Sequence, residues 1–443
     1  MTDPAPMYAT LDDWVARTAI PFALDAPAAF NAAVATLATA LGNSVELLGL
    51  GEALHGGEDV LLLRNRLFQQ LVAAHGYSAI ALESSMPRSR LVNDYVAGRG
   101  PASYAAVRDA GFSHGFGQLT ANQELVEWMR HYNATASPRV PLQFYGFDSP
   151  TEMMGSDSPR QVLYVVLDYL TAIDDALGQE YRQCIDPLLG DDSAWANPAA
   201  MMDPTQSIGR SANASALRIE TEELLADLRI RRPELVASSD EARYAEALHS
   251  ATVATQLLTY HAGVARASSD RTARLLGLRD AMMADNLAYL VARERGRGHV
   301  LAFAHNSHLR RGKAEWQLGA DLYHWWPAGA HLHVLLGPRY AVIGSAVGES
   351  PANGIATPEA GTLESRLTAV PGPIRLLPTH RGHALPAAAI AALPTRSGSV
   401  KNPSYFALTP QSLTDFDWLA VFDTTVYSRG GPPLDGGNVN ARQ

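Results

Sequence analysis

Residues that can move protons stand directly after several apolar segments of this sequence. Glu52 and His55 follow the first segment, Glu83 ends the second, and His305 and His308 follow a later one. A histidine paired with a carboxylate is suited to proton transfer near neutral pH, because the carboxylate fixes the tautomer of the imidazole. We therefore interpret these five residues as candidates for general acid–base catalysis.

The apolar segments themselves predict a parallel sheet that is covered on both faces. They are short and rich in aliphatic residues, which is typical of buried parallel strands. We expect strands at residues 45–50, 78–82, 142–147, 300–304, 332–336, 340–343 and 419–422. The carboxyl ends of parallel strands lie at one edge of a sheet, where ligands bind. Asp148 and Asn306, which also follow strands, are therefore expected to join the candidate site as substrate-binding residues, and His308 is expected to contact the substrate as well.

A helix is predicted between the first two strands, starting after Gly56 and Gly57 and ending at Gly76. Its N-terminus is expected at the same edge of the sheet, where free N–H groups would favour developing negative charge, as in an oxyanion. Arg64 lies near the start of this helix and is a candidate substrate-binding cation. The alternative is a solvated surface arginine.

Long Ala- and Leu-rich patterns at 242–262 and 272–291 predict a helical region inside the α/β alternation. We expect residues 1–155 and 296–443 to form the two parts of an α/β catalytic domain, and residues 156–295 to form a helical insertion. Arg279 lies on one helical stripe with Met283 and Asn286. It is either a site cation or a buried arginine with an acidic partner.

The composition excludes several classes of protein. A net charge of −10 argues against a nucleic-acid-binding protein, which would be basic. Hydrophobic residues make up 47% and charged residues 18%, which indicates a folded chain. The acidic start and the lack of an apolar run of about 20 residues predict a cytoplasmic protein without a membrane partner. The single cysteine, Cys184, cannot form an internal disulfide.

Taken in order along the chain, these motifs resemble those of the erythromycin esterase family. The resemblance runs from about Leu48 to Gly348, with a weaker tail at 416–424. It rests on Gly51–Gly56, Glu83, Trp128–Asn133, Tyr145–Asp148, Arg279 with Met283 and Asn286, and Ala304–His308.

The resemblance implies an α/β fold with a helical insertion and hydrolysis of a macrolactone ester without a covalent serine intermediate. It further implies that His55 is the general base that activates water and that Glu52 and Glu83 orient the base or the water. The polar site would be completed by Arg64, Arg279, His305 and His308, as carbonyl polarisers or proton donors. The expected partner is a large ester or lactone of a bulky natural product, with no cofactor and no metal.

Two stretches depart from the family pattern. Leu54 stands where members often have threonine or another small residue, and the aromatic-rich stretch 323–333 has no clear counterpart. Both are expected in or near the walls of the pocket. The resemblance therefore leaves the substrate open between macrolides and other large esters or lactones.

Three alternatives remain open from the sequence. Gly111-Phe-Ser113-His-Gly115 matches the nucleophile elbow of serine hydrolases, but the preceding residues predict a short helix where the elbow needs a strand. The histidines and glutamates could ligate a metal, and the fold also resembles haem-binding proteins, although no HExxH or paired-cysteine motif is present. The same site could also serve cyclisation, elimination or acyl transfer in natural-product biosynthesis.

Overall fold

The structure is a computed structural model that describes residues 7–135, 140–152, 155–383 and 385–432. It divides into two compact units. The first contains the residues up to Ser84, Arg88–Phe147 and the residues from Leu290 onward, and the second contains Ser85–Pro87 and Asp148–Tyr289.

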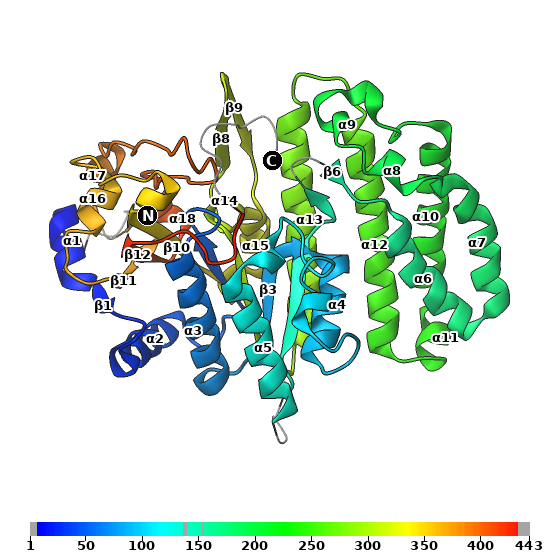
Figure 1. Ribbon diagram of the computed structural model, residues 1–443, viewed down its shortest axis with the longest axis horizontal. Coiled ribbons are helices and arrows are strands. Elements are labelled where there is room, and N and C mark those ends of the chain that lie inside the picture. Colours follow the sequence, from blue (N-terminus) through cyan, green and yellow to red (C-terminus); the bar gives the residue numbers. More distant parts are fainter. Residues whose placement is uncertain (1–6, 136–139, 153–154, 384, 433–443) are drawn as a thin grey trace, which may run out of the picture. The chain divides into compact units, whose positions relative to one another are not determined.

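The first unit is built on an eight-stranded sheet (Figure 1). From one edge to the other its strands are β1 (Ile20–Phe22), β11 (Ile374–Pro378), β12 (Trp418–Thr424), β10 (Tyr340–Glu349), β2 (Leu47–Glu52), β7 (His299–His305), β3 (Tyr77–Ser85) and β4 (Gln143–Asp148). The pairs from β12 to β3 are parallel, whereas β11 runs antiparallel to both of its neighbours, β12 and β1. The predicted α/β fold with a mostly parallel sheet is therefore confirmed.

The helices of the first unit follow from its apolar patterns and turn signals. They are α1 (Leu11–Thr18), α2 (Pro27–Leu41), α3 (Glu58–Ala74), α4 (Met86–Val96), α5 (Thr120–Ala134), α14 (Asn306–Leu309), α15 (Ala328–Leu336), α16 (Leu363–Leu367), α17 (Ala387–Ala391) and α18 (Ser412–Asp415). A small antiparallel hairpin, β8 (Ala314–Leu318) with β9 (Asp321–Trp325), lies between α14 and α15 in the chain.

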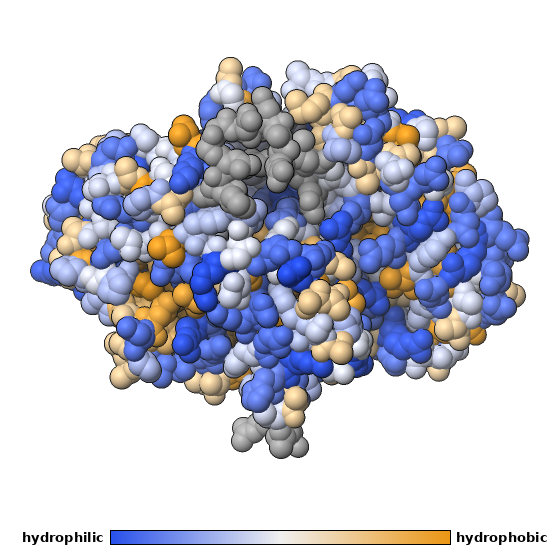
Figure 2. Space-filling view, in the orientation of Figure 1, coloured by the Kyte–Doolittle hydropathy of each residue, from blue (hydrophilic) through white to orange (hydrophobic). Residues whose placement is uncertain are grey.

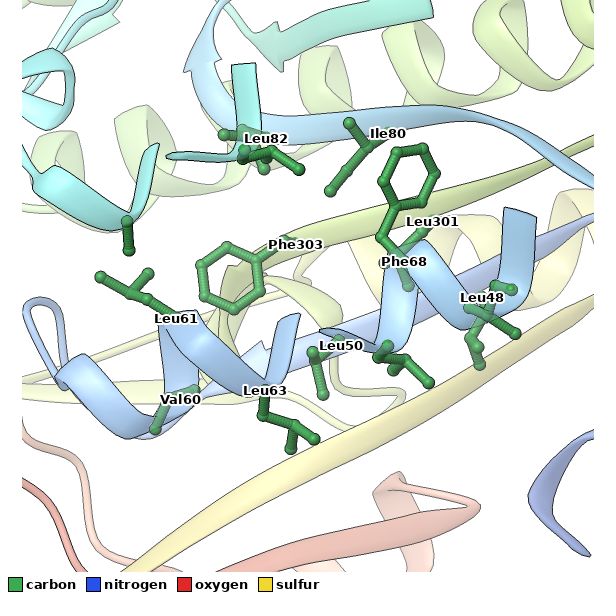
Figure 3. Close-up of a cluster of buried hydrophobic side chains, with 14 of the residues drawn as sticks. Leu48, Leu50, Val60, Leu61, Leu63, Phe68, Ile80, Leu82, Leu301 and Phe303 are labelled. Atoms are coloured by element: carbon green, nitrogen blue, oxygen red, sulfur yellow. The ribbon is translucent and has the colours of Figure 1, made fainter. Parts of the chain in front are cut away.

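The core next to the candidate site lies between α3 and the central strands. Figure 3 shows apolar side chains of α3, among them Leu61 and Phe68, pointing toward those of β2, β7 and β3. Phe303 on β7 and Leu50 on β2 belong to this cluster and are almost completely buried. Burying side chains of this size stabilises the fold by about 1.5–3 kcal/mol each, so the strands that carry the candidate residues are held firmly.

The second unit is mainly helical (Figure 1). Its helices are α6 (Arg160–Ile173), α7 (Asp175–Leu189), α8 (Asp192–Trp195), α9 (Ala199–Met202), α10 (Ala212–Ile230), α11 (Arg232–Ala237), α12 (Glu241–Val264) and α13 (Arg271–Glu294), the last of which ends in the first unit. The two long helices that the sequence predicts are α12 and α13. Leu163, Leu224 and Leu257 share one buried core of this unit.

The strand expected at 332–336 is wrong, because these residues form the end of α15. A short apolar run does not distinguish a strand from a helix by periodicity alone. Here Pro327 precedes the helix and Gly337, at a φ of 55°, ends it. Val334 is 84% exposed, so this run is not buried in the sheet as expected.

Hydrophilic and hydrophobic residues intermingle on the face of the molecule drawn in Figure 2. Within the described residues, every helix is too short or too polar to span a lipid bilayer.

Candidate active site

Three adjacent parallel strands carry the central candidate residues to one edge of the sheet. Glu52 ends β2 and is the direct neighbour of His305, which ends β7, in the register of these strands. Glu83 lies near the end of β3, on the other side of β7. The structure thus brings together Glu52, His55, Glu83, His305 and His308, which the sequence predicts to converge.

His55 and Glu52 form a hydrogen-bonded pair. Nδ1 of His55 lies 2.7 Å from Oε1 of Glu52. The Glu52 side chain is buried, whereas that of His55 is 33% exposed. Among the residues that the structure describes, Nε2 of His55 has no hydrogen-bond partner, and Oε2 of Glu52 is buried without one. Nε2 is therefore the ring nitrogen of His55 that is left to accept a proton.

The pKa values of both members of this pair are raised, for different reasons. Burial lowers the pKa of His55, but the hydrogen bond to Glu52 and its charge outweigh this effect and raise the pKa above 6.5. Burial raises the pKa of Glu52, which the hydrogen bond from His55 only partly offsets. Because the two groups interact closely, they titrate as a pair.

Glu83 connects His305, at the end of β7, with His308 in α14. Its Oε2 accepts the backbone N–H of His305 at 2.8 Å, and its Oε1 lies 3.3 Å from Nε2 of His308. Both Glu83 and His308 are buried. The site therefore contains a second histidine–carboxylate pair, distinct from His55 and Glu52.

His305 uses both ring nitrogens within the protein. Its Nδ1 accepts the backbone N–H of Ser307 at 3.1 Å, and its Nε2 lies 2.9 Å from the carbonyl oxygen of Ser404, which can only accept. The proton of the neutral ring therefore lies on Nε2. Burial, together with the charge of His55, lowers the pKa of His305 to about 3, so the ring is neutral near pH 7.

Arg64 is not the surface arginine that the sequence allows, because it is 1% exposed. Its Nε and Nη2 donate to Oδ1 of Asn65 at 3.0 and 2.7 Å, and its guanidinium lies 4.8 Å from the ring centre of Phe303. Burial lowers the pKa of Arg64 to about 10, against the opposing charge of Glu52. It remains a cation whose field reaches the Glu52 carboxylate.

Arg279 and Asp148 belong to the second unit and pair with each other. Nη2 of Arg279 donates to Oδ2 of Asp148 at 2.6 Å, and both side chains are buried. This is the buried arginine with an acidic partner that the sequence offers as the alternative. Asn286, on the same helical stripe, lies with its Oδ1 2.9 Å from Nε2 of His249.

Asn306, a predicted substrate-binding residue, bonds the backbone of β10. Its Nδ2 donates to the Ser345 carbonyl at 2.8 Å, and its Oδ1 accepts the Ser345 N–H at 3.0 Å. A side chain at Gly51 would collide with Asn306, so glycine is required there. This amide thus fastens α14 to the sheet.

The N-terminus of α3 is closed by the segment that follows β12. The N–H of Glu58 donates to the Val426 carbonyl at 3.0 Å, and the N–H of Asp59 donates to Oγ1 of Thr425 at 3.2 Å. The expectation that free amides at this helix start favour an oxyanion is wrong for these two groups, because both already have partners.

The structure around Ser113 does not have the form of a nucleophile elbow. Ser113 is preceded by a short 3₁₀ helix at Tyr104–Ala106 and turns, and not by the strand that such a nucleophile needs.

Leu54, expected in a pocket wall, is fully buried against Val347 and Tyr405. Within the described ranges, no group of three or more histidine, cysteine, aspartate or glutamate side chains is placed to hold a metal ion.

Asn402 and Ser404 contact His55 and were not predicted from the sequence. Oγ of Ser404 accepts the His55 N–H at 2.9 Å, and Nδ2 of Asn402 donates to the His55 carbonyl at 3.1 Å. No local spacing links these residues to His55, because they come from a loop near the other end of the chain. An Asn-Pro-Ser sequence alone predicts only a turn.

Comparisons with known proteins agree with this architecture. Structural matches include a Bacillus cereus protein, at 18% identity and a TM-score of 0.74 over 95% of this chain and 98% of that one. A succinoglycan biosynthesis protein matches at 19% identity and a TM-score of 0.70 over 95% and 98% of the two chains. An erythromycin esterase mutant in its open conformation matches at 18% identity and a TM-score of 0.63 over 89% and 94%.

None of the curated proteins matches the sequence. The erythromycin esterase family model matches residues 72–425, which include Glu83, His305 and His308 but begin after Glu52 and His55. This match covers most of the sequence, and the chain therefore belongs to the erythromycin esterase family.

Proposed function

We propose that this protein hydrolyses an ester or lactone of a bulky natural product and that His55 is its general base. The observation that carries the proposal is the His55–Glu52 pair, in which Nδ1 is bound to the carboxylate and Nε2 has no partner among the described residues. An imidazole held in this way can take a proton from water while Glu52 stabilises the resulting positive charge.

The proposed reaction begins with attack of water on the ester carbonyl carbon. Nε2 of His55 removes a proton from the water as the new C–O bond forms, and the carbonyl oxygen becomes a tetrahedral oxyanion. Arg64 supplies positive potential at this edge of the sheet, and a buried cation of this kind favours the developing negative charge. The C–O bond to the leaving alcohol then breaks, and the alkoxide takes up a proton.

We propose that the His308–Glu83 pair delivers this proton to the leaving group. His308 lies 3.3 Å from the carboxylate of Glu83, which would stabilise its protonated form. His55 then releases the proton that it took from water to the solvent, and His308 takes up a proton from the solvent, so both groups return to their starting states. In the alternative route, His55 returns its proton directly to the alkoxide. The proposal uses residues of the first unit only and gives Arg279, Asp148 and Asn306 no chemical step.

Family membership and the surroundings of His55 both support a large substrate. The Phe116 ring lies 5.4 Å from that of His55 and is only partly buried, so an apolar surface adjoins the base. The solved structures carry names as different as erythromycin esterase and succinoglycan biosynthesis protein. At this level of identity they support the fold and leave the substrate to experiment.

The test is a mass-spectrometric screen of the purified, EDTA-treated protein against macrolides and other macrolactones, with His55→Ala as the control. A product heavier than its substrate by one water, absent with the variant, would support a metal-independent hydrolase. A product of equal or lower mass would replace the proposal with cyclisation or elimination. Stoichiometric metal, or a haem Soret band, in the protein before EDTA treatment would instead favour the metal- or haem-binding alternative.

A further inference from the structure

The loop at 402–406 makes hydrogen bonds to the turn that carries His55, at Ala53 and at His55 itself. Besides the bonds of Asn402 and Ser404 to His55, the N–H of Phe406 donates to the Ala53 carbonyl at 2.9 Å. The loop therefore fixes the backbone on both sides of Leu54. Both polar groups of the His55 backbone are occupied by side chains from this loop.

The hydrogen bonds of this loop fix the orientation of its side chains. Oδ1 of Asn402 accepts the N–H and the hydroxyl of Ser404, at 3.1 and 2.6 Å. Its Nδ2 donates to the carbonyl of His55 and, at 2.8 Å, to Oδ1 of Asn353. Since the hydroxyl hydrogen of Ser404 is directed to Asn402, its oxygen is available to accept the His55 N–H.

The same loop binds His305. The Ser404 carbonyl accepts Nε2–H of His305, and the Phe406 ring packs edge-on against the imidazole at 4.7 Å. The ring of His305 lies 5.3 Å from that of His55. Ser404 thus joins the two histidines, with its hydroxyl on one and its carbonyl on the other.

We propose that Asn402 and Ser404 are positioning residues for His55, and that His305 holds Ser404 in place and does not transfer a proton during the reaction. His305 has no ring nitrogen left for a substrate, because Ser307 and Ser404 occupy both. The expected effects on kcat rest on the proposed function, in which His55 is the base. The positioning of His55 by Asn402 and Ser404 does not depend on that function.

Serine variants test the first half of the proposal. Ser404→Ala removes the acceptor for the His55 N–H, and a misplaced base lowers the rate of the chemical step more than substrate binding. We expect kcat to fall between about 10-fold and 100-fold with little change in KM, and Ser404→Thr, which keeps the hydroxyl, to recover most of the loss. Wild-type kcat in a folded Ser404→Ala protein would overturn the proposal.

Ser412→Ala is the matched control for these variants. Ser412 is a buried serine of the same C-terminal region, and among the described residues its hydroxyl oxygen accepts only the nearby Thr409 N–H, at 3.1 Å. We expect this variant to keep the wild-type kcat. An equal loss in Ser412→Ala and Ser404→Ala would mean a general effect on folding and would contradict a specific role for Ser404.

Glutamine at position 305 tests the second half. A glutamine amide can place an N–H where Nε2–H of His305 lies, but it cannot titrate. If His305 is a positioning residue, His305→Gln retains at least about tenfold more activity than His305→Ala. If His305 donates or accepts a proton in the reaction, both variants lose activity equally and the proposal fails.

A substrate-free measurement separates this proposal from the proposed function. The His55 pKa can be followed by NMR of the labelled imidazole, and the other charged groups that act on it, Glu83 and His308, are unchanged in the serine variants. Loosening the His55–Glu52 bond in Ser404→Ala should lower the His55 pKa, whereas Ser412→Ala should not. An unchanged pKa in Ser404→Ala would count against positioning even if no substrate is ever found.

Discussion

The imidazole rings of His55 and His305 lie 5.3 Å apart, yet the protein favours opposite protonation states in the two rings. His55 is bound to a carboxylate that raises its pKa, and burial lowers the pKa of His305 to about 3. Two neighbouring histidines at one sheet edge are thus separated into a ring that can exchange a proton and a ring that stays neutral. This difference comes from the Glu52 carboxylate beside His55 and from the burial of His305.

Removing the side chain of His55 or of Glu83 should abolish most of the activity. We expect His55→Ala and Glu83→Ala each to lower kcat by at least about 100-fold, the size of effect expected for a lost general base or its supporting carboxylate. Steady-state kinetics on folded proteins measure this effect. His131→Ala, at an exposed histidine on α5, is the control and should behave as wild type. Near-normal turnover in either site variant would remove that residue from the mechanism.

The pH dependence should follow the pair formed by His55 and Glu52. The base acts when it is unprotonated, so kcat/KM should fall as the pH drops through the His55 pKa, which lies above 6.5. Glu52→Gln keeps an acceptor for Nδ1–H but removes the charge that raises this pKa. We therefore expect a lower maximal rate and an acidic limb displaced to lower pH. A limb at the same pH in the variant would show that another group controls it.

The sequence predicts the residues at the ends of strands well, because hydrophobic runs and parallel topology are local signals. β2, β3, β4 and β7 form where the apolar runs predict them, and they bring Glu52 and Glu83 to the same edge as His305. The strands β1 and β11, whose pairings are antiparallel, are short and were not predicted, since three to five residues carry little periodic signal.

The environment of each site residue could not be predicted in the same way. That Arg64 is buried, that Arg279 pairs with Asp148, and that the amides at the start of α3 are occupied all depend on contacts between distant segments. Asn402 and Ser404 are the clearest case, because their contact with His55 exists only once the C-terminal loop has packed against the turn after β2.

Replacing Gly56 should strain the turn that carries His55. Gly56 has a φ of 81°, and a Cβ there would lie 2.8 Å from Cε2 of Tyr427. Gly98→Ala is a matched control, because Gly98 has a φ of 74° and open space around it. A left-handed backbone costs a non-glycine residue about 1–2 kcal/mol, and overpacking adds about 1–3 kcal/mol. Chemical unfolding should therefore show a larger loss for Gly56→Ala, and equal losses would mean that the Tyr427 ring moves freely.

Acid should destabilise the protein through His261 in the second unit. Its Nε2 lies 2.9 Å from the Asp157 carbonyl, its ring packs edge-on against Trp195, and burial lowers its pKa from 6.5 to about 4.

Below pH 6.5 His261 binds a proton in the unfolded chain but stays unprotonated in the folded protein. The free energy of unfolding therefore falls as the pH drops from about 6.5 to about 4. The shift corresponds to about 3 kcal/mol. His261→Gln keeps a donor for Asp157 but cannot titrate, so the variant should lose correspondingly less stability between pH 7 and pH 4. Urea unfolding at the two pH values measures the difference. His305 is neutral and buried in both proteins, so its contribution to the difference cancels. Equal losses of stability in wild type and variant would show that His261 is not the group that acid protonates on unfolding.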